Sequence, residues 1–179
     1  MKIHYEISGK GPIALLFIHG WMGNCRWWDA QRDYFQDRYT FLQMDLPGHG
    51  KSDFLQDGYS SSKYADAIAS VASNIKDKNV VLVGHSMSGA YVLEAFAKIP
   101  KVKSIVIVDT LKDFGQLPTL EQAEAMMFTP YRSDFENTVR HMLPKFLFGP
   151  ETPDHVKDRL IQEFLNTTSD HAIDRKSVV

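Results

Sequence analysis

The residues best suited to chemistry lie in the segment Gly84 to Gly89, which reads GHSMSG and follows the four apolar residues Val80 to Val83. Three of those four residues are β-branched, which favours a buried strand, and the small residues after Ser86 favour a closely packed helix. A sharp turn between strand and helix lifts the Ser86 hydroxyl out of the sheet and directs the helix N-terminus at the group that it attacks. The pattern predicts Ser86 as a catalytic nucleophile.

A serine hydroxyl is a poor nucleophile at neutral pH unless a base accepts its proton. Its attack on a carbonyl also creates an oxyanion, which backbone N–H groups stabilise. We expect one donor at Met87, the residue after the serine, and a second at Trp21, in the loop that follows the apolar run 13–18. Loss of one such donor typically raises the barrier by on the order of 3 kcal/mol.

Five runs of apolar or alternating residues predict strands, over residues 2–8, 13–18, 39–44, 80–83 and 102–108. Helix signals lie between them: Asn24 caps one helix, the serines at 60–62 start a second, and a third extends from the Ser86 turn to about Ile99. Strands that alternate with helices predict the α/β class, with a mostly parallel sheet covered by helices.

Several candidate segments fall at the carboxyl ends of the predicted strands, where ligands bind in α/β proteins. They are His19 to Trp21, the Gly- and Pro-rich loop Asp45 to Gly50, Ser86 and Asp109. Their convergence is more specific than any one of them, and it predicts a single crevice.

From residue 112 no β-like run appears, and helix signals follow one another. Thr119 to Gln122 and Ser133 to Glu136 fit capping boxes, and Thr152 precedes a proline at the first position of another helix. A last helix is expected to begin near Ser169 or Asp170. We therefore expect two parts, a core over 1–111 and a helical cap over 112–179.

The chain resembles the α/β-hydrolase superfamily, in its small serine esterase and haloperoxidase-like branch. The matching motifs are HGW at 19–21, DLPGHGKS at 45–52, GHSMSG at 84–89 and IVIVDT at 105–110. The resemblance implies that residues 1–111 form the N-terminal part of the hydrolase core and that 112–179 form the cap inserted after this strand.

The chain departs from the family pattern in two places. The pattern has glycine two residues after the nucleophile, where this chain has Ser88, which fits with some crowding of the turn. Family members also add core strands and helices after the cap, which carry an Asp and a His. The 179 residues contain neither segment, so the expected core is incomplete.

Several residues of this chain are candidates to replace the missing acid and base. Asp109 lies at a strand end where some family members place the acid, with structural capping as the alternative. His85 should point away from Ser86, and His19 and His49 resemble loop-structuring histidines of the family. The other histidines are expected on a strand or on cap helices, and they are His4, His141, His155 and His171.

The charge and composition of the chain bear on its partners and on its cellular compartment. A formal net charge of −2 gives no electrostatic case for nucleic acid or for an anionic membrane. The longest apolar run, Ile13 to Ile18, is too short for a membrane span, and the single cysteine, Cys25, is consistent with a reducing compartment. We expect a cytoplasmic protein without a cofactor. No metal is expected either, since no His, Asp or Glu cluster has ligand spacing.

The leading hypothesis is a serine hydrolase that acts on a small, fairly apolar ester or related acyl compound through an acyl-enzyme. The alternatives are a hydrolase-fold small-molecule binding protein and a catalytically impaired fragment of a larger hydrolase. In an incomplete core the strand 102–108 would have one bare edge. We expect self-association through it, or a partner chain that completes the sheet.

Overall fold

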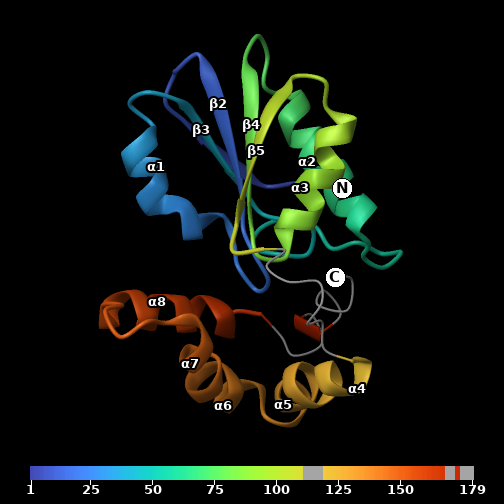
Figure 1. Ribbon diagram of the computed structural model, residues 1–179, viewed down its shortest axis with the longest axis vertical. Helices are drawn as coiled ribbons and strands as arrows, with labels where there is room; N and C mark the ends of the chain where they lie inside the picture. The colour runs from blue at the N-terminus through green and yellow to red at the C-terminus, as the bar shows by residue number, and fades with distance from the viewer. Residues whose placement is uncertain (111–118, 168–171, 174–179) are drawn as a thin grey trace. The chain divides into compact units, whose positions relative to one another are not determined.

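The computed structural model describes residues 1–110, 119–167 and 172–173 (Figure 1). The chain divides into two compact units, one within residues 1–112 and the other within residues 113–177. The first unit holds a sheet with its helices, and the second is helical.

The sheet of the first unit has five strands in the order β1-β3-β2-β4-β5. The strands are β1 (Tyr5–Ser8), β2 (Ile13–Ile18), β3 (Thr40–Met44), β4 (Asn79–His85) and β5 (Val102–Val108). All are parallel except β1, which pairs antiparallel with β3. The prediction of a mostly parallel α/β sheet is confirmed.

The first strand is shorter than predicted and is antiparallel to its neighbour β3. It begins at Tyr5 rather than at residue 2, and it runs antiparallel because only residues 9–12 separate it from β2. Such a short connection reverses the chain, so β1 runs opposite to β2 and also to β3, which lies between them in the sheet and is parallel to β2. Gly9 has φ +69, a left-handed conformation that suits glycine in this turn.

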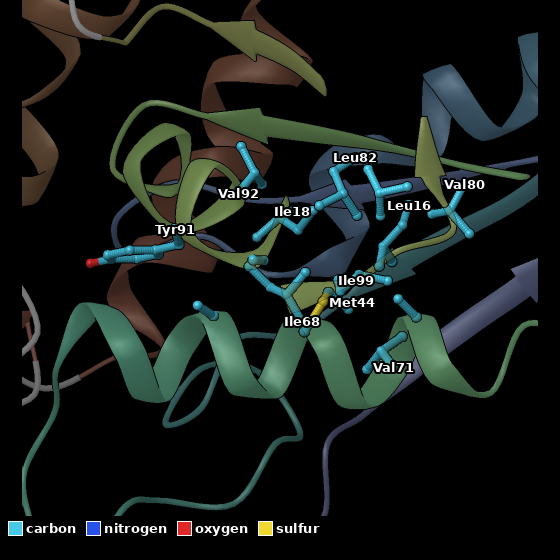
Figure 2. Close-up of a cluster of buried hydrophobic side chains, with 14 of the residues drawn as sticks. Leu16, Ile18, Met44, Ile68, Val71, Val80, Leu82, Tyr91, Val92 and Ile99 are labelled. Carbon is cyan, nitrogen blue, oxygen red and sulfur yellow. The ribbon is translucent and has the colours of Figure 1, made fainter. Parts of the chain in front are cut away.

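Helices cover both faces of the sheet in the first unit (Figure 1). Side chains alternate along β2, so Leu16 and Ile18 join the core under α2 (Ser61–Ser73) and α3 (Ser88–Lys98), as Figure 2 shows. Phe17 faces the other side, where its ring lies 4.9 Å from that of Trp28 in η1 (Cys25–Trp28), which leads into α1 (Asp29–Phe35). The run 13–18 is apolar throughout because both its faces are covered.

The second unit is a series of short helices. They are α4 (Leu120–Ala123), the π-helical η3 (Glu124–Phe128), α5 (Thr129–Ser133), α6 (Phe135–Asn137), the π-helical η4 (Thr138–Met142), α7 (Pro144–Leu147) and α8 (Asp154–Leu165). None of the helices in the described ranges is long and apolar enough to cross a bilayer.

The predicted helix starts of this unit agree with the structure at one position and miss by one residue at two. Thr119 and Gln122 form the reciprocal hydrogen bonds of a capping box. The second cap is Asp134 rather than Ser133, since its carboxylate accepts the Asn137 N–H at 3.1 Å. Pro153 is itself the cap of α8, which begins at Asp154. The helix expected near residue 169 lies outside the described residues.

The last strand of the sheet, β5, pairs with β4 alone within the described part of the chain. Val106 and Val108 on this strand are 46% and 38% exposed. An exposed edge of β-branched residues templates pairing with another strand. We predict that this edge pairs with a second copy or with a partner chain.

Lysine at position 106 is expected to weaken that pairing, because edge charges oppose strand addition. Light scattering of the unsubstituted chain should give a mass above the 20.4 kDa of one chain, and Val106→Lys should lower it. The control is Tyr34→Lys, a lysine at an exposed apolar position on α1. A monomer at every concentration would contradict the prediction.

Candidate active site

Ser86 lies in the turn between β4 and α3, with a backbone φ of +52°. This left-handed conformation is costly for a residue with a Cβ and persists only where the surroundings enforce it. Here the Ser86 N–H donates to the Val108 carbonyl at 2.8 Å, and its own carbonyl accepts the Gly89 N–H at 3.0 Å and the Thr110 hydroxyl. The end of β5 thus holds the serine in its strained turn.

Two glycines allow the strand, the helix and the end of β5 to come this close. A Cβ on Gly89 would lie 2.4 Å from Thr110 Cγ2, and one on Gly84 would lie 2.8 Å from the Ser88 carbonyl oxygen. Real Cβ atoms do not approach heavy atoms so closely. The glycine pattern around Ser86 therefore reflects steric limits at a tight turn.

The loop after β2 runs against this turn. A Cβ on Gly20 would lie 3.2 Å from Ser86 Cβ and 2.8 Å from His85 Nδ1. Gly20 and Gly23 close a backbone turn through a 3.1 Å hydrogen bond, with Met22 in a left-handed conformation at φ +58°. The structure therefore brings the segment that contains Trp21 beside the predicted nucleophile.

The other predicted oxyanion donor, Met87, precedes the first residue of α3 and is 4% exposed. Among the residues that the structure describes, its N–H has no acceptor. An N–H at a helix N-terminus carries partial positive charge and suits a developing negative charge. The position of Met87 is compatible with its predicted role.

His19 is a fully buried structural residue, in keeping with the sequence-based expectation. Its Nε2 accepts the Leu46 N–H at 3.0 Å, and its Nδ1 lies 2.7 Å from the Gly20 carbonyl oxygen. Because Nε2 accepts, the proton is on Nδ1, which donates to Gly20. The ring joins the loop after β2 to the loop after β3.

Asp109 follows the last residue of β5, and His85 and Val108 are partners in the β4–β5 register, so Ser86 and Asp109 leave the sheet at neighbouring strand ends. It is exposed and has a left-handed φ of +55°. No hydrogen bond joins the Ser86 hydroxyl to a histidine within residues 1–110, 119–167 and 172–173. The candidate acid and the candidate nucleophile thus lie at the same end of the sheet, and no described histidine is hydrogen-bonded to the Ser86 hydroxyl.

The remaining histidines have varied surroundings. His49 Nδ1 lies 3.0 Å from the Pro47 carbonyl oxygen, within the loop after β3. His141 and His155 are exposed residues of η4 and α8 in the second unit. His171 lies outside the described residues.

The His85 ring packs near the Trp27 and Trp28 rings, at centroid distances of 5.7 and 6.1 Å. Burial lowers the pKa of His85 below its ordinary 6.5, although the negative charge of Asp109 opposes this shift. Unfolded His85 therefore binds a proton at a higher pH than folded His85 does. Stability should fall as the pH drops from about 6.5 toward the lower pKa of the folded protein.

His85→Phe keeps an aromatic ring that cannot titrate, so it should reduce this acid-induced loss. Urea unfolding at pH 7.5 and pH 5 measures the loss for each protein. His155→Gln, at an exposed position on α8, serves as the control. If the His85→Phe variant and the unsubstituted chain lose the same stability between pH 7.5 and pH 5, protonation of His85 does not cause the loss.

One group of side chains has metal-ligand character, although the sequence indicated none. Ligand atoms of His4, Glu6 and Cys25 all lie within 4.8 Å of one another. Sequence spacing does not indicate this group, because Cys25 is distant in the chain from the other two residues. Burial, followed by the charge of Asp45, raises the pKa of the Cys25 thiol. A metal would have to displace that proton.

The sequence also did not reveal the role of Asp45, a carboxylate that is 1% exposed. It accepts the Cys25 N–H at 2.6 Å and the Lys51 N–H at 2.8 Å. A Cβ on Gly50, which has φ +51, would lie 2.2 Å from this carboxylate. Asp45 therefore joins the end of the loop after β2 to the loop after β3.

The parallel sheet, its helices on both faces and the serine turn at the end of β4 define an α/β protein of the hydrolase fold. A profile of the alpha/beta hydrolase family matches residues 15–175, and the chain belongs to this family. The resemblance drawn from the four motifs is thereby confirmed.

Known relatives include several hydrolases. The chain is 36% identical to 2-(acetamidomethylene)succinate hydrolase of Mesorhizobium japonicum over 110 residues. The aligned segment covers 61% of this chain and 39% of that protein. It is 33% identical over 112 residues to a bifunctional esterase/perhydrolase of Acinetobacter calcoaceticus, covering 60% of this chain and 41% of the relative. The chain thus spans about two fifths of the length of these relatives.

Solved structures share the fold over nearly the whole chain. An esterase from Exiguobacterium antarcticum matches with a TM-score of 0.83 and 22% identity, over 96% of this chain and 66% of that one. A bromoperoxidase from Bacillus anthracis matches with a TM-score of 0.84 and 18% identity, over 98% of this chain and 68% of the other.

Proposed function

We propose that the protein is a serine hydrolase of a small, fairly apolar ester or related acyl compound. The observation that carries the proposal is the left-handed Ser86, held between β4 and α3 with the Gly20 backbone against it. The hydrolase and esterase relatives support hydrolytic chemistry on an acyl group.

In the proposed reaction the Ser86 oxygen attacks the carbonyl carbon while its proton passes to a base. The Met87 and Trp21 N–H groups donate to the oxyanion. The tetrahedral intermediate then collapses and expels the alcohol, which takes the proton from the base. An acyl-enzyme remains. Water then attacks the acyl carbon, releases the acid and restores the serine hydroxyl. Asp109 is the proposed acid that would orient the base.

A second candidate function is that of a small-molecule binding protein with the hydrolase fold. The observation that favours it is the lack of a described histidine hydrogen-bonded to the Ser86 hydroxyl. Without a base, only the residual catalysis of the oxyanion donors and of substrate binding would remain. A serine hydrolase would therefore turn over an ester substrate, whereas a binding protein would not.

Burst kinetics with p-nitrophenyl acetate, butyrate and octanoate separate them. We expect acylation by these activated esters to be faster than deacylation, so a serine hydrolase should release nearly one equivalent of p-nitrophenolate rapidly and then turn over steadily. The series of acyl chains also reports how apolar the preferred acyl group is. Release no faster than the uncatalysed reaction for all three esters would contradict the proposal and favour a binding protein.

A further inference from the structure

We propose that Ser88 is a positioning residue that fixes the loop carrying the second oxyanion donor. Its hydroxyl donates a hydrogen bond to the backbone carbonyl of His19, 69 residues earlier in the chain. Ser88 is the first residue of α3 and is 0% exposed. This inference rests on the proposed function, in which Ser86 is the nucleophile and Trp21 donates to the oxyanion.

The need for such a contact follows from the backbone at Gly20. Glycine tolerates many backbone conformations, so the residues around it must fix the direction of the next N–H group. The Gly20 carbonyl belongs to the same planar peptide unit as the Trp21 N–H. It accepts from His19 Nδ1 at 2.7 Å and from the Gly23 N–H at 3.1 Å.

Those two bonds hold the peptide unit after Gly20, and the Ser88 hydroxyl holds the one before it. With both units fixed, the backbone torsions of Gly20 have little freedom. The Trp21 N–H is then oriented relative to α3, the helix that begins directly after Ser86 and Met87. One turn of chain thus supplies the nucleophile, one oxyanion donor and the contact that orients the other.

Serine at this position is the chain's departure from the glycine of the family motif. A glycine would leave the His19 carbonyl without this donor. The turn itself leaves little space, since a Cβ on Gly84 would lie 2.8 Å from the Ser88 carbonyl oxygen. The Ser88 side chain is accommodated because it is directed at the loop after β2, where its hydroxyl bonds His19.

The test compares Ser88→Ala and Ser88→Gly with the unsubstituted chain, using p-nitrophenyl butyrate. We expect kcat to fall by about tenfold or more with KM little changed, because a misaligned donor fails mainly when the oxyanion forms. Ser88→Gly is the variant safest for folding, since it restores the residue of the family motif.

The matched control is Thr40→Ala. The Thr40 hydroxyl also donates to a backbone carbonyl, that of Gly11, at 2.8 Å, and the residue is 3% exposed. It lies at the amino end of β3, opposite the strand ends that carry the site. Thr40→Ala should lower Tm while kcat stays unchanged. An equal kcat in the Ser88 variants and the Thr40→Ala variant would overturn the proposal.

Amide hydrogen exchange at Gly23, whose N–H donates to the Gly20 carbonyl, tests the contact without relying on turnover. Exchange at this amide should rise about tenfold in both Ser88 variants and stay constant in Thr40→Ala, because the loop opens more often without its anchor. If the unsubstituted chain hydrolyses no ester, the proposed function fails, yet this measurement still decides the role of Ser88. Unchanged Gly23 exchange in the Ser88 variants would refute it.

Discussion

Ser86→Ala is expected to lower kcat/KM for p-nitrophenyl esters by a factor on the order of a thousand or more. Removal of the hydroxyl ends the acyl-enzyme route and leaves only the oxyanion donors to assist attack by water. Steady-state hydrolysis and the p-nitrophenolate burst should both disappear. A variant that retains its burst would show that another residue is the nucleophile.

Ser86→Gly separates the loss of chemistry from changes in folding. Glycine suits the φ of +52° at this position, whereas alanine keeps a Cβ in the strained conformation. The glycine variant should melt at a higher temperature than the alanine variant, yet both should be equally inactive. An active Ser86→Gly variant would exclude Ser86 as the nucleophile, since glycine has no side-chain oxygen.

Asp45→Ala is expected to lower the free energy of unfolding by about 3–6 kcal/mol. This carboxylate is buried and accepts two backbone N–H groups, and each bond to a charged acceptor contributes about 1.5–3 kcal/mol. Without it, the Cys25 and Lys51 N–H groups lose their partner. The corresponding fall in Tm is on the order of 10 °C for a chain of this size.

Urea or thermal unfolding measures this effect, with Asp33→Ala as the control. The Asp33 side chain is 64% exposed and pairs with Arg32 at the surface, so its removal should cost at most about 1 kcal/mol. Asp45→Asn keeps one acceptor oxygen without the charge and should fall between the two. A loss for Asp45→Ala no larger than that for Asp33→Ala would contradict the account of this carboxylate.

The sequence predicted those parts of the fold whose signals are local. The runs Ile13 to Ile18 and Val102 to Val108 are strands with these bounds, and Ser60 caps α2 through its hydroxyl, which accepts the Lys63 N–H. Apolar periodicity and capping depend on residues within a few positions, so one sequence suffices to recognise them. The starts of two helices differ from their predictions by one residue, since the caps are Asp134 and Pro153.

The contacts that shape the site could not be predicted in the same way. The carbonyl that accepts the Ser88 hydroxyl lies 69 residues away, and Asp45 accepts an N–H from 20 residues earlier in the chain. Nothing in the local pattern specifies such partners. The sequence therefore marked Ser88 only as a departure from a motif and Asp45 only as part of a loop. Both depend on the folded chain, which brings the loop after β2 against the start of α3 and against the loop after β3.

The most direct test of the central claim is covalent labelling of the unsubstituted chain with a fluorophosphonate, followed by intact mass and peptide mapping. This reagent modifies serines whose hydroxyl is activated. We predict one adduct per chain, on Ser86, with none in the Ser86→Ala variant. An unlabelled chain, or an adduct on any other residue, would contradict the claim that Ser86 is an activated nucleophile.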